Sequence, residues 1–581
     1  MIPICKRYFP SVLATLVTGA LYLSTRIPAS AGSDDPWWKH AVVYEIYPRS
    51  FQDSKGNGVG DLNGITARLD YLQALGVDAV WIAPMYPSPQ VDFGYDVADY
   101  ENVDPQYGTL ADFDRLVAEA KKRDIRIVLD MVVNHTSDKH KWFIESSRSR
   151  TDPMHDWYCW SDGRPGPDGT PMPPNNWVSL FGGSAWQFVP SAGQFYYHKF
   201  YRQQPDLNWR NPAVEKAMFD SMRFWLDRGV AGFRLDAVPE LFEDEQLRDE
   251  PATGGRNAQG DLNLNHIYTN SLPEVHGVLQ RMRAMVEQYP GDRVLIGETY
   301  LPSTAEMDKW YGGDRHDELQ LPMDMLIGFI NRLDAGKFRQ RLLEVETQIH
   351  GSQPLIVFDN HDNVRSWDRY GDGVHNLQIA KIVATILLAS KSTALMYQGE
   401  ELGQTTTTPT RVEDVKDPIG ITGWPKEKGR DGERTPMQWD DSNPQAGFST
   451  NPKTWLPVPA SYATVNVKAE LADPNSVLNW YRQLIALRRS NPALHDGRMV
   501  FLDQGNPSVL SFGRVDESGR VVLVSLNMTR TAQTVYLNPS DAGAKGAQVT
   551  TLMTSDPALE SVRSTQGVVL PPFATWVASI E

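Results

Sequence analysis

The stretch Gly229-Val230-Ala231-Gly232-Phe233-Arg234-Leu235-Asp236-Ala237-Val238 decides the fold prediction for this chain. It is short and mostly apolar and begins at a glycine turn, which is typical of a buried β-strand. Arg234 and Asp236 are two residues apart, so on a strand their side chains point to the same side. A guanidinium does not titrate, and its charge lowers the pKa of a neighbouring carboxylate. We therefore expect Asp236 to stay ionised, as a nucleophile must.

Seven other segments share this strand-like character, and segments with helical spacing of apolar residues separate them. Residues 62–75 and 112–123 are examples of the helical pattern. Eight strands alternating with helices predict an α/β fold, a closed parallel barrel of the (β/α)8 TIM type. The active site of such a barrel lies at the C-terminal ends of its strands. Besides 230–238, the predicted strands are 41–47, 77–83, 126–133, 294–300, 318–323, 354–359 and 394–398.

Two long segments interrupt the alternation of strands and helices. Residues 151–204 are rich in Pro, Gly, Trp and Tyr and too irregular for one helix, so we expect an inserted subdomain over the barrel mouth after strand 3. Short strands separated by turns near the C-terminus predict a small antiparallel β-domain. The predicted boundaries are 1–31 for a signal peptide, 32–135 and 206–498 for the two parts of the barrel, 136–205 for the inserted subdomain, 404–467 for a further wall of the entrance and 499–581 for the C-terminal β-domain.

The N-terminus has the pattern of an export signal. Lys6 and Arg7 precede the apolar run 11–23, and Ala29-Ser30-Ala31 offers the small residues of a cleavage site. A membrane span would need about 20 apolar residues, more than this run contains. We therefore expect a periplasmic or secreted mature chain that begins near Gly32 and has no membrane segment.

The composition limits the classes of partner. The net charge is −16 at pH 7, and loss of the basic signal segment would make it more negative. An acidic chain argues against binding to nucleic acid or to anionic membranes. Because Cys5 leaves with the signal, Cys159 would be the only thiol, and no intrachain disulfide is expected. The oligomeric state is left open.

Four of the predicted strands end in polar residues. An isolated acid at a strand end is usually a turn cap or one half of an ion pair. Several strand ends that all carry acids or histidines are instead the pattern of catalytic residues in a barrel. The four ends are Asp130-Met131-Val132-Val133-Asn134-His135, Arg234-Leu235-Asp236, Gly297-Glu298-Thr299-Tyr300 and Asp359-Asn360-His361-Asp362.

These four segments resemble the signature regions of the α-amylase family of glycoside hydrolases, family 13, and occur in that family's order. The resemblance covers nearly all of the mature chain. Gln204-Pro205-Asp206-Leu207-Asn208 is similar to the motif that marks the oligo-1,6-glucosidase and α-glucosidase branch. The segments 44–51 and 434–439 resemble that branch as well.

The resemblance implies three catalytic acids. Asp236 would be the nucleophile, Glu298 the general acid/base, and Asp362 the carboxylate that stabilises the transition state. A retaining glycosidase needs two carboxyls about 5 Å apart, one ionised to attack and one protonated to donate. We expect neighbouring negative charge to keep Glu298 protonated while Arg234 keeps Asp236 ionised.

Substrate-binding residues follow from the same resemblance. Asp92 matches an Asp that holds the non-reducing end of the sugar, Tyr95 a Tyr that stacks on its face, and Arg430 the Arg that pairs with that Asp. If Asp92 and Arg430 close the pocket, only one glucosyl unit fits beyond the cleaved bond, and the enzyme acts from chain ends. His135 and His361 match histidines that bind sugar hydroxyls, while a metal role for them lacks further ligands. The remaining candidates are Arg234 and the aromatic residues Phe181 and Phe200, for which ordinary packing is an equal alternative.

The expected activity is that of a retaining, exo-acting α-glucosidase. Its substrates would be maltose, malto-oligosaccharides and other short α-glucosides, with release of α-glucose and with transglucosylation at high sugar concentration. Ala237 bears on the linkage, since members of this branch restricted to α-1,6 bonds tend to carry Val there and those preferring α-1,4 bonds carry Thr or Ala. We therefore expect a preference for α-1,4 bonds.

The segment 53–61 resembles the family's calcium loop but departs from its pattern. Lys55 stands where an Asn or Asp ligand is usual, and an ammonium cannot bind calcium. We expect the ammonium to take the ion's place and no cofactor to be required. The alternative is a structural calcium ion, for which the candidate ligands are Asp53, Asn57, Val59 and Asp61.

Two other functions fit parts of the sequence. The first is a glucosyltransferase or isomerase of the same fold, of the trehalose synthase or sucrose isomerase type. Sucrose isomerases carry a charged Arg-Leu-Asp-Arg-Asp loop, of which Arg332-Leu333-Asp334-Ala335-Gly336 keeps about half. The second is a non-catalytic sugar-binding protein or partner subunit, against which the presence of all three acids argues.

Overall fold

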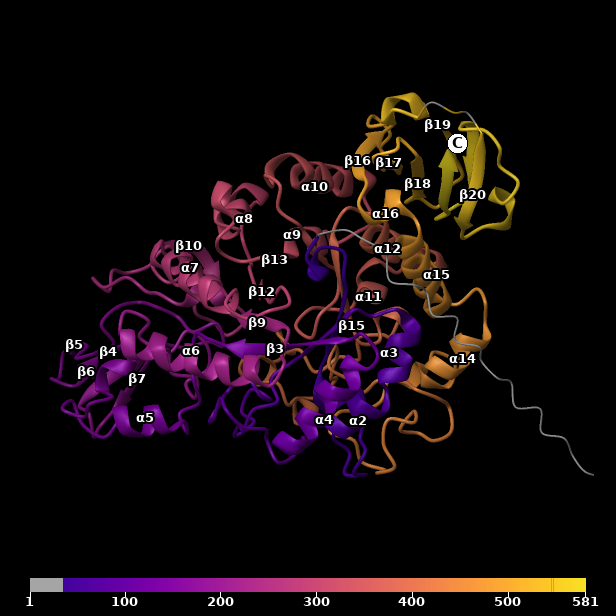
Figure 1. Ribbon diagram of the computed structural model, residues 1–581. Coiled ribbons are helices and arrows are strands. Elements are labelled where there is room, and N and C mark those ends of the chain that lie inside the picture. The colour runs from indigo at the N-terminus through magenta and orange to yellow at the C-terminus, as the bar shows by residue number, and fades with distance from the viewer. Residues whose placement is uncertain (1–34, 545, 547, 581) are drawn as a thin grey trace, which may run out of the picture. The chain divides into compact units, whose positions relative to one another are not determined.

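Eight parallel strands close into a barrel in the computed structural model, which describes residues 35–544, 546 and 548–580 (Figure 1). The predicted signal peptide, 1–31, lies outside the described residues. The TIM-barrel prediction is confirmed, and each predicted barrel strand is present. In barrel order the strands are β1 (Val42–Ile46), β15 (Thr393–Tyr397), β14 (Leu355–Val357), β13 (Leu321–Asp324), β12 (Val294–Gly297), β9 (Gly232–Asp236), β3 (Arg126–Val132) and β2 (Ala79–Ile82).

Strand β9 lies between β3 and β12. Its Arg234 is opposite Asp130 of β3 and Ile296 of β12. A Cβ atom at Gly232 would lie 2.1 Å from the carbonyl oxygen of Val294, so a glycine is required where the two strands approach. This close pairing places the C-terminal ends of β3, β9 and β12 beside one another.

Helices connect the strands, with small differences from the predicted ranges. Helix α4 (Leu110–Lys121) begins before the predicted 112–123, because Thr109 and Asp112 form a capping box at its start. The predicted helix 62–75 divides at Arg68 into two short helices. These are α2 (Leu62–Ala67) and α3 (Leu69–Leu75), and the longer barrel helices are α6 (Pro212–Asp227), α7 (Glu274–Val286), α10 (Ala335–Gln348), α12 (Asn376–Ala389) and α15 (Val477–Ser490).

The segment between β3 and β9 contains a small subdomain. Its three-stranded sheet has the order β4 (Trp160–Ser161), β8 (Gln194–Tyr197), β7 (Trp186–Val189). An aromatic core of its own includes Trp177 and Phe195. The first part of the segment holds helix α5 (Lys141–Ser146).

A hairpin after β9 was not predicted. It consists of β10 (Ala252–Arg256) and β11 (Leu262–Leu264), whose residues are nearly all exposed and so show no alternation of apolar and polar side chains. The loop that leads to it supports the inserted subdomain. Nε1 of Trp177 donates to the carbonyl oxygen of Arg248 at 2.8 Å, and Nδ2 of Asn176 donates to that of Glu250 at 2.8 Å.

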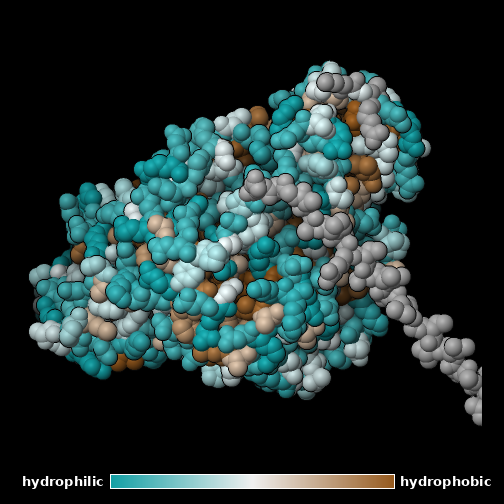
Figure 2. Space-filling view, viewed as in Figure 1, coloured by the Kyte–Doolittle hydropathy of each residue, from teal (hydrophilic) through white to brown (hydrophobic). Residues whose placement is uncertain are grey.

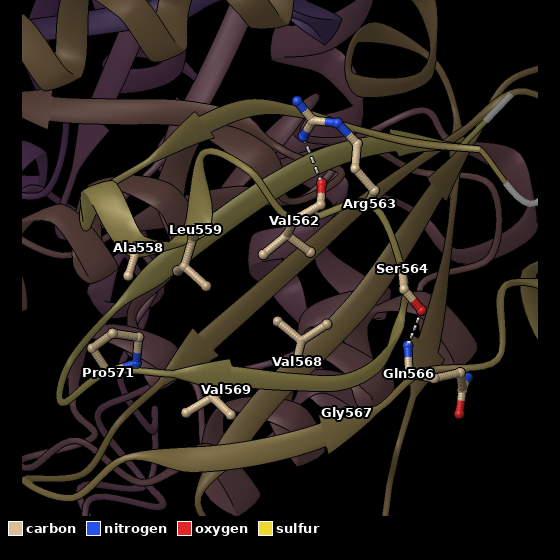
Figure 3. Close-up of a pocket in the computed structure, with 10 residues that line it drawn as sticks. All are labelled: Ala558, Leu559, Val562, Arg563, Ser564, Gln566, Gly567, Val568, Val569 and Pro571. Carbon is tan, nitrogen blue, oxygen red and sulfur yellow. Dashed lines mark hydrogen bonds between the residues drawn. The ribbon is translucent and has the colours of Figure 1, made fainter.

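The C-terminal region is an antiparallel β-domain, as predicted. Its five-stranded sheet has the order β16 (Arg498–Leu502), β17 (Val509–Val515), β18 (Val521–Asn527), β22 (Thr575–Ile580), β20 (Val549–Thr554). A separate pair is formed by β19 (Gln533–Tyr536) and β21 (Gln566–Leu570), the second of which was not predicted. Figure 3 shows a hollow beside β21, lined by Leu559, Val562 and Val568 among others, and none of the predicted site residues lines it.

The surface carries mainly polar side chains on the face drawn in Figure 2, where apolar residues occur in small groups. Across residues 35–544, 546 and 548–580, no helix has both the length and the apolar character needed to cross a membrane.

Candidate active site

Asp236 and Glu298, far apart in the sequence, meet at the ends of adjacent strands. Asp236 is the last residue of β9, and Glu298 directly follows β12. Nη1 of Arg234 donates to Oδ1 of Asp236 at 2.6 Å, and Nη2 of the same guanidinium lies 2.7 Å from Oε1 of Glu298. One planar cation therefore holds both acids at one place.

Arg234 is itself fixed from behind. Its side chain is 0% exposed, and its Nη1 donates to both carboxylate oxygens of Asp130 at 3.0 Å. The guanidinium lies 4.9 Å from the centroid of a Trp81 ring, whose Nε1 donates to Asp130 at 3.2 Å. The orientation of the cation is thus set by buried neighbours on β2 and β3.

Ala237 directly follows Asp236 in the chain, and its backbone contacts Glu298. It is left-handed, with φ of 47° and ψ of 33°, and its N–H donates to Oε2 of Glu298 at 2.9 Å. This conformation is uncommon for a residue with a Cβ atom, and strain of this kind concentrates at functional sites. Both carboxylate oxygens of Glu298 consequently face a positive or N–H partner.

The pKa values of both acids are raised. Burial raises the pKa of Asp236 to about 7, because Asp130 and Asp362 add to burial and Arg234 only partly offsets them. Burial also raises the pKa of Glu298 to about 7, against the effect of Arg234. The prediction that Arg234 would keep Asp236 ionised by lowering its pKa is therefore wrong, since burial outweighs the cation. The two carboxyls titrate as a pair near neutral pH.

Asp362 differs from the other two acids because two arginines contact it. Arg434 donates to its Oδ1 at 2.8 Å, and Arg430 donates to the same oxygen at 3.1 Å. Burial by itself would raise the pKa of Asp362, but the positive groups around it outweigh burial and hold that pKa well below its usual range. Asp362 is therefore ionised at neutral pH.

Arg430 connects Asp362 to Asp92. Its Nη2 donates to Oδ1 of Asp92 at 2.8 Å. Asp417 holds the guanidinium in place, accepting from Nε at 2.9 Å and from Nη2 at 2.8 Å. Nε2 of Gln204 donates to the second carboxylate oxygen of Asp92 at 3.1 Å. We call Asp92, Arg430 and Asp362 the polar wall.

The two predicted histidines lie beside Tyr95. Nε2 of His361 is 2.7 Å from the hydroxyl of Tyr95, and the two rings stack with centroids 5.3 Å apart. Nδ1 of His361 is 2.5 Å from Oε1 of Glu45. Nε2 of His135 lies 3.1 Å from the carbonyl oxygen of Tyr95. Burial lowers the pKa of His135 to about 3 and that of His361 well below its usual range, so both imidazoles are neutral.

Phe181 and Phe200 pack against other predicted site residues. Phe181 is 2% exposed, and its ring centroid lies 5.4 Å from the guanidinium carbon of Arg430. The rings of Phe200 and His135 have centroids 5.1 Å apart. Both phenylalanines thus reach the site from the inserted subdomain, and their contact with sugar stays a prediction.

A further aromatic pair near the acids was missed by sequence reasoning. Tyr300, two residues after Glu298, stacks on Phe329 with ring centroids 5.7 Å apart. The two side chains are 42% and 48% exposed. Aromatic surface left open beside a carboxyl group is suited to contact with a sugar ring. Tyr300 stood in a quoted motif, whereas no sequence pattern marked Phe329.

No role was predicted from the sequence for four polar residues that position the site, namely Asp130, Glu45, Gln204 and Asp417. Asp130, Glu45 and Gln204 lie in motifs that the sequence analysis quoted, so the signal for them was present. Asp417 lies in the irregular segment 404–467, where no pattern distinguishes it from its neighbours.

The loop 53–61 uses its carboxylates within the protein. Asp53 accepts three backbone N–H groups of its own loop and the hydroxyl of Ser449, at 2.6 to 2.9 Å. Asp61 accepts the N–H and hydroxyl of Ser54 and a further N–H at the start of α2. Nζ of Lys55 donates to the carbonyl oxygen of Gln106 at 2.8 Å.

Comparison with known proteins establishes the family. The model of the α-amylase catalytic domain matches residues 45–497. The chain therefore belongs to the α-amylase family of glycoside hydrolases, and it is a glycosidase. It is 43% identical over 520 residues to a probable α-glucosidase of Rhizobium meliloti, with 87% of this chain and 91% of that protein covered. It is 38% identical over 524 residues to an oligo-1,6-glucosidase of Parageobacillus thermoglucosidasius, with 84% and 90% covered.

Similar proteins of known structure have the same fold, and their names include activities other than that of an α-glucosidase. An α-glucosyl transfer enzyme, XgtA, is 39% identical and superposes with a TM-score of 0.83, covering 94% of this chain and all of that one. The trehalulose synthase MutB from Pseudomonas mesoacidophila MX-45 is 34% identical, with a TM-score of 0.85 and the same coverage. A carbohydrate substrate is thus supported, while the names of similar proteins include glucosidases, a glucosyl transfer enzyme and a trehalulose synthase.

Proposed function

We propose that the protein is a retaining, exo-acting α-glucosidase that releases α-glucose from the non-reducing ends of maltose and short α-glucosides. The observation that carries the proposal is the convergence of Asp236 and Glu298 on Arg234, beside a polar wall that ends in Asp92. The first feature suits double displacement, and the second suits a pocket for a single glucosyl unit.

In the first step, Asp236 attacks the anomeric carbon while Glu298 donates its proton to the glycosidic oxygen. The bond between that carbon and the leaving sugar breaks, and a covalent glucosyl ester forms on Asp236. Because the two acids titrate together near neutral pH, one proton is available to the pair. When that proton lies on Glu298, Asp236 is free to attack.

In the second step, Glu298 acts as a base and takes a proton from water. The water oxygen attacks the anomeric carbon, and the ester bond to Asp236 breaks. Two inversions at one carbon give α-glucose. A sugar hydroxyl in place of water would give transglucosylation by the same route.

Asp362 stabilises the positive charge that develops on the sugar in both transition states. Its two arginine partners keep it ionised, so it does not compete for the proton that Glu298 must hold. In this proposal His135 and His361 hydrogen-bond hydroxyl groups of the bound glucosyl unit, and Tyr95 stacks on its face. Because the two imidazoles are neutral, they leave the negative charge of Asp362 unreduced.

Asp92 and Arg430 limit the depth of the pocket in this proposal. A longer chain would have to pass the ion pair that they form, which Asp417 and Gln204 hold on either side. Only the terminal glucosyl unit therefore reaches the acids, and cleavage proceeds from the chain end.

The proposed linkage preference is for α-1,4 bonds, and it rests on the small side chain of Ala237. That residue lies between the two acids, where a branched side chain would narrow the space for the leaving sugar.

Transfer or isomerisation is the second candidate, favoured by the similarity to XgtA and MutB. Against isomerisation, Arg332 is 73% exposed and Asp334 caps helix α10 by accepting from the N–H of Lys337 at 3.0 Å. In the segment that resembles the loop of sucrose isomerases, Asp334 therefore caps a helix, and Arg332 is exposed to solvent. We further propose an exported protein without a required cofactor, in which Lys55 replaces a calcium ion in the loop 53–61.

Product analysis tests the proposal directly. Maltose, isomaltose, trehalose and sucrose are incubated in parallel, and products are followed by NMR from the first turnovers. We expect maltose to be cleaved fastest, with glucose appearing as the α-anomer. A β-anomeric product would refute double displacement, and conversion of sucrose into an isomer without net hydrolysis would favour the second candidate.

A further inference from the structure

A cluster of two histidines and two aspartates lies at the opposite end of the barrel from the acids. His40 comes just before β1, whose other end points toward the active site. His495 is the last residue of α16 (Pro492–His495), and Asp496 directly follows it. Asp35 lies near the start of the described chain. The cluster joins the segment that enters the barrel to the segment that leads into the C-terminal β-domain.

The distances within the cluster are short. Nε2 of His40 is 2.6 Å from Oδ1 of Asp496 and 3.3 Å from Oδ2 of Asp35. Nδ1 of His495 is 2.7 Å from Oδ2 of Asp496. One ligand atom each from His40, His495 and Asp496 lie within 4.8 Å of one another. Small inward movements would bring these atoms to the spacing around one ion.

The two imidazoles lie against each other beside Asp496. Their rings have centroids 4.1 Å apart, and the side chains are only 12% and 14% exposed. Imidazole nitrogen is a common ligand of zinc, and here two such nitrogens face one carboxylate in a partly buried place.

The carboxylates supply the negative charge. Asp496 is 46% exposed, and its only ion-pair partners among the described residues are His40 and His495. Asp35 is 32% exposed and pairs through Oδ1 with Lys39 at 2.7 Å, which leaves its Oδ2 on the side of His40.

We propose that His40, His495 and Asp496 form a binding site for a divalent transition metal ion of the zinc class. Two imidazole nitrogens and a carboxylate oxygen suit zinc, whereas calcium and magnesium prefer oxygen alone. The ion would tie together two segments that are far apart in the sequence, and so stabilise the folded chain. It has no part in the proposed hydrolysis.

The test is a metal titration of the full mature chain, purified without a histidine tag and stripped with a chelator. Zn²⁺ binding is measured by calorimetry, Co²⁺ binding by its visible absorption, and Tm is followed against zinc concentration. We expect one saturable site per chain, a zinc-dependent rise in Tm, and roughly tenfold or greater weakening in His495→Ala and in the isosteric Asp496→Asn.

His350→Ala is the matched control. His350 also pairs with an aspartate, at 3.2 Å from Asp308, but its side chain is 67% exposed. Its replacement should leave zinc affinity and the Tm response unchanged. The proposal is overturned if the parent chain shows no saturable zinc site, or if His495→Ala and Asp496→Asn bind zinc as tightly as His350→Ala. Folding of each variant is checked by retention of glycosidase activity.

Discussion

The backbone N–H of Ala237 donates to the carboxylate of Glu298 at 2.9 Å, although Ala237 is in a left-handed conformation. The residue after the proposed nucleophile therefore positions the proposed acid. This relation gives one small residue two effects, one on the space for the leaving sugar and one on the orientation of the proton donor.

Replacing Ala237 by Val should reduce activity on maltose. A β-branched side chain is poorly tolerated at positive φ, and it also fills the space beside the cleaved bond. We expect kcat/KM for maltose to fall by about tenfold or more, and that for isomaltose to fall less. Ala237→Gly, which removes the strain, is the control for the backbone effect. A Val variant that cleaves both disaccharides at unchanged relative rates would contradict the steric reading.

Replacing Glu298 by Gln should slow maltose cleavage by about 10²–10⁴-fold, because the leaving sugar then departs without a proton. A substrate with an acidic phenol as leaving group needs little protonation, so its first step should be much less affected. Pre-steady-state kinetics would show a burst of the phenol in this variant. Asp236→Asn should give no burst with either substrate, and a burst there would exclude it as the nucleophile.

Replacing Arg430 by Met should weaken the polar wall and lower activity. Arg430 donates to both Asp92 and Asp362, so its loss removes the partner that these two acids share. We expect kcat/KM for maltose to fall by about tenfold or more, while the acid limb of the pH profile, which Asp236 sets, stays near neutral pH. Arg411→Met is a suitable control, since Arg411 is 63% exposed and its ion-pair partners among the described residues are acids of the same surface segment. Equal activities of the two variants would contradict the assignment.

The parent enzyme should show a narrow bell-shaped pH dependence of kcat/KM centred near neutral pH. Burial raises the pKa of both Asp236 and Glu298 to about 7, so both carboxyls change protonation near neutral pH. Activity falls as pH decreases, because Asp236 becomes protonated, and falls as pH increases, because Glu298 loses its proton. A rate that stays constant between about pH 5 and pH 9 would be incompatible with these pKa values.

Truncating either residue of the exposed pair Tyr300 and Phe329 should change the ratio of transfer to hydrolysis, that is, how often a sugar rather than water reacts with the glucosyl ester. Tyr300→Ala and Phe329→Ala each remove a surface on which an acceptor sugar can stack, at a cost of about 1 kcal/mol. We expect the ratio of transfer to hydrolysis at high maltose concentration to fall in both variants. Tyr536→Ala, which alters a 66% exposed tyrosine of the C-terminal β-domain, should leave the ratio unchanged.

The sequence was most informative where side chains are buried. Each barrel strand was visible as an apolar run, and the polar residues at their ends were found because strand ends of a barrel share one face. The hairpin of β10 and β11 was missed because exposed residues such as those of Ala252–Arg256 carry no periodic signal. Phe329 was missed for a different reason, since its role depends on Tyr300, a neighbour distant in the sequence.

Electrostatics was the least predictable aspect of the site. The sequence shows that Arg234 lies next to Asp236 on one strand, and this favoured a lowered pKa. It does not show that Asp130 lies opposite on β3 or that water is excluded, and these two features raise the pKa instead. Counting the charges along one strand therefore predicts the wrong direction for the pKa shift of Asp236, because the other groups that act on this carboxyl come from elsewhere in the fold.

Asp417 and Arg430 belong to one and the same entrance segment, and the guanidinium is held by its own segment as firmly as by the barrel. One half of the ion pair that limits the depth of the pocket therefore comes from this segment, and the other half, Asp92, comes from the barrel part of the chain. Exchanging residues 404–467 between related enzymes that keep Asp92 should change the length of chain end that the pocket accepts, while Asp236 and Glu298 stay in place.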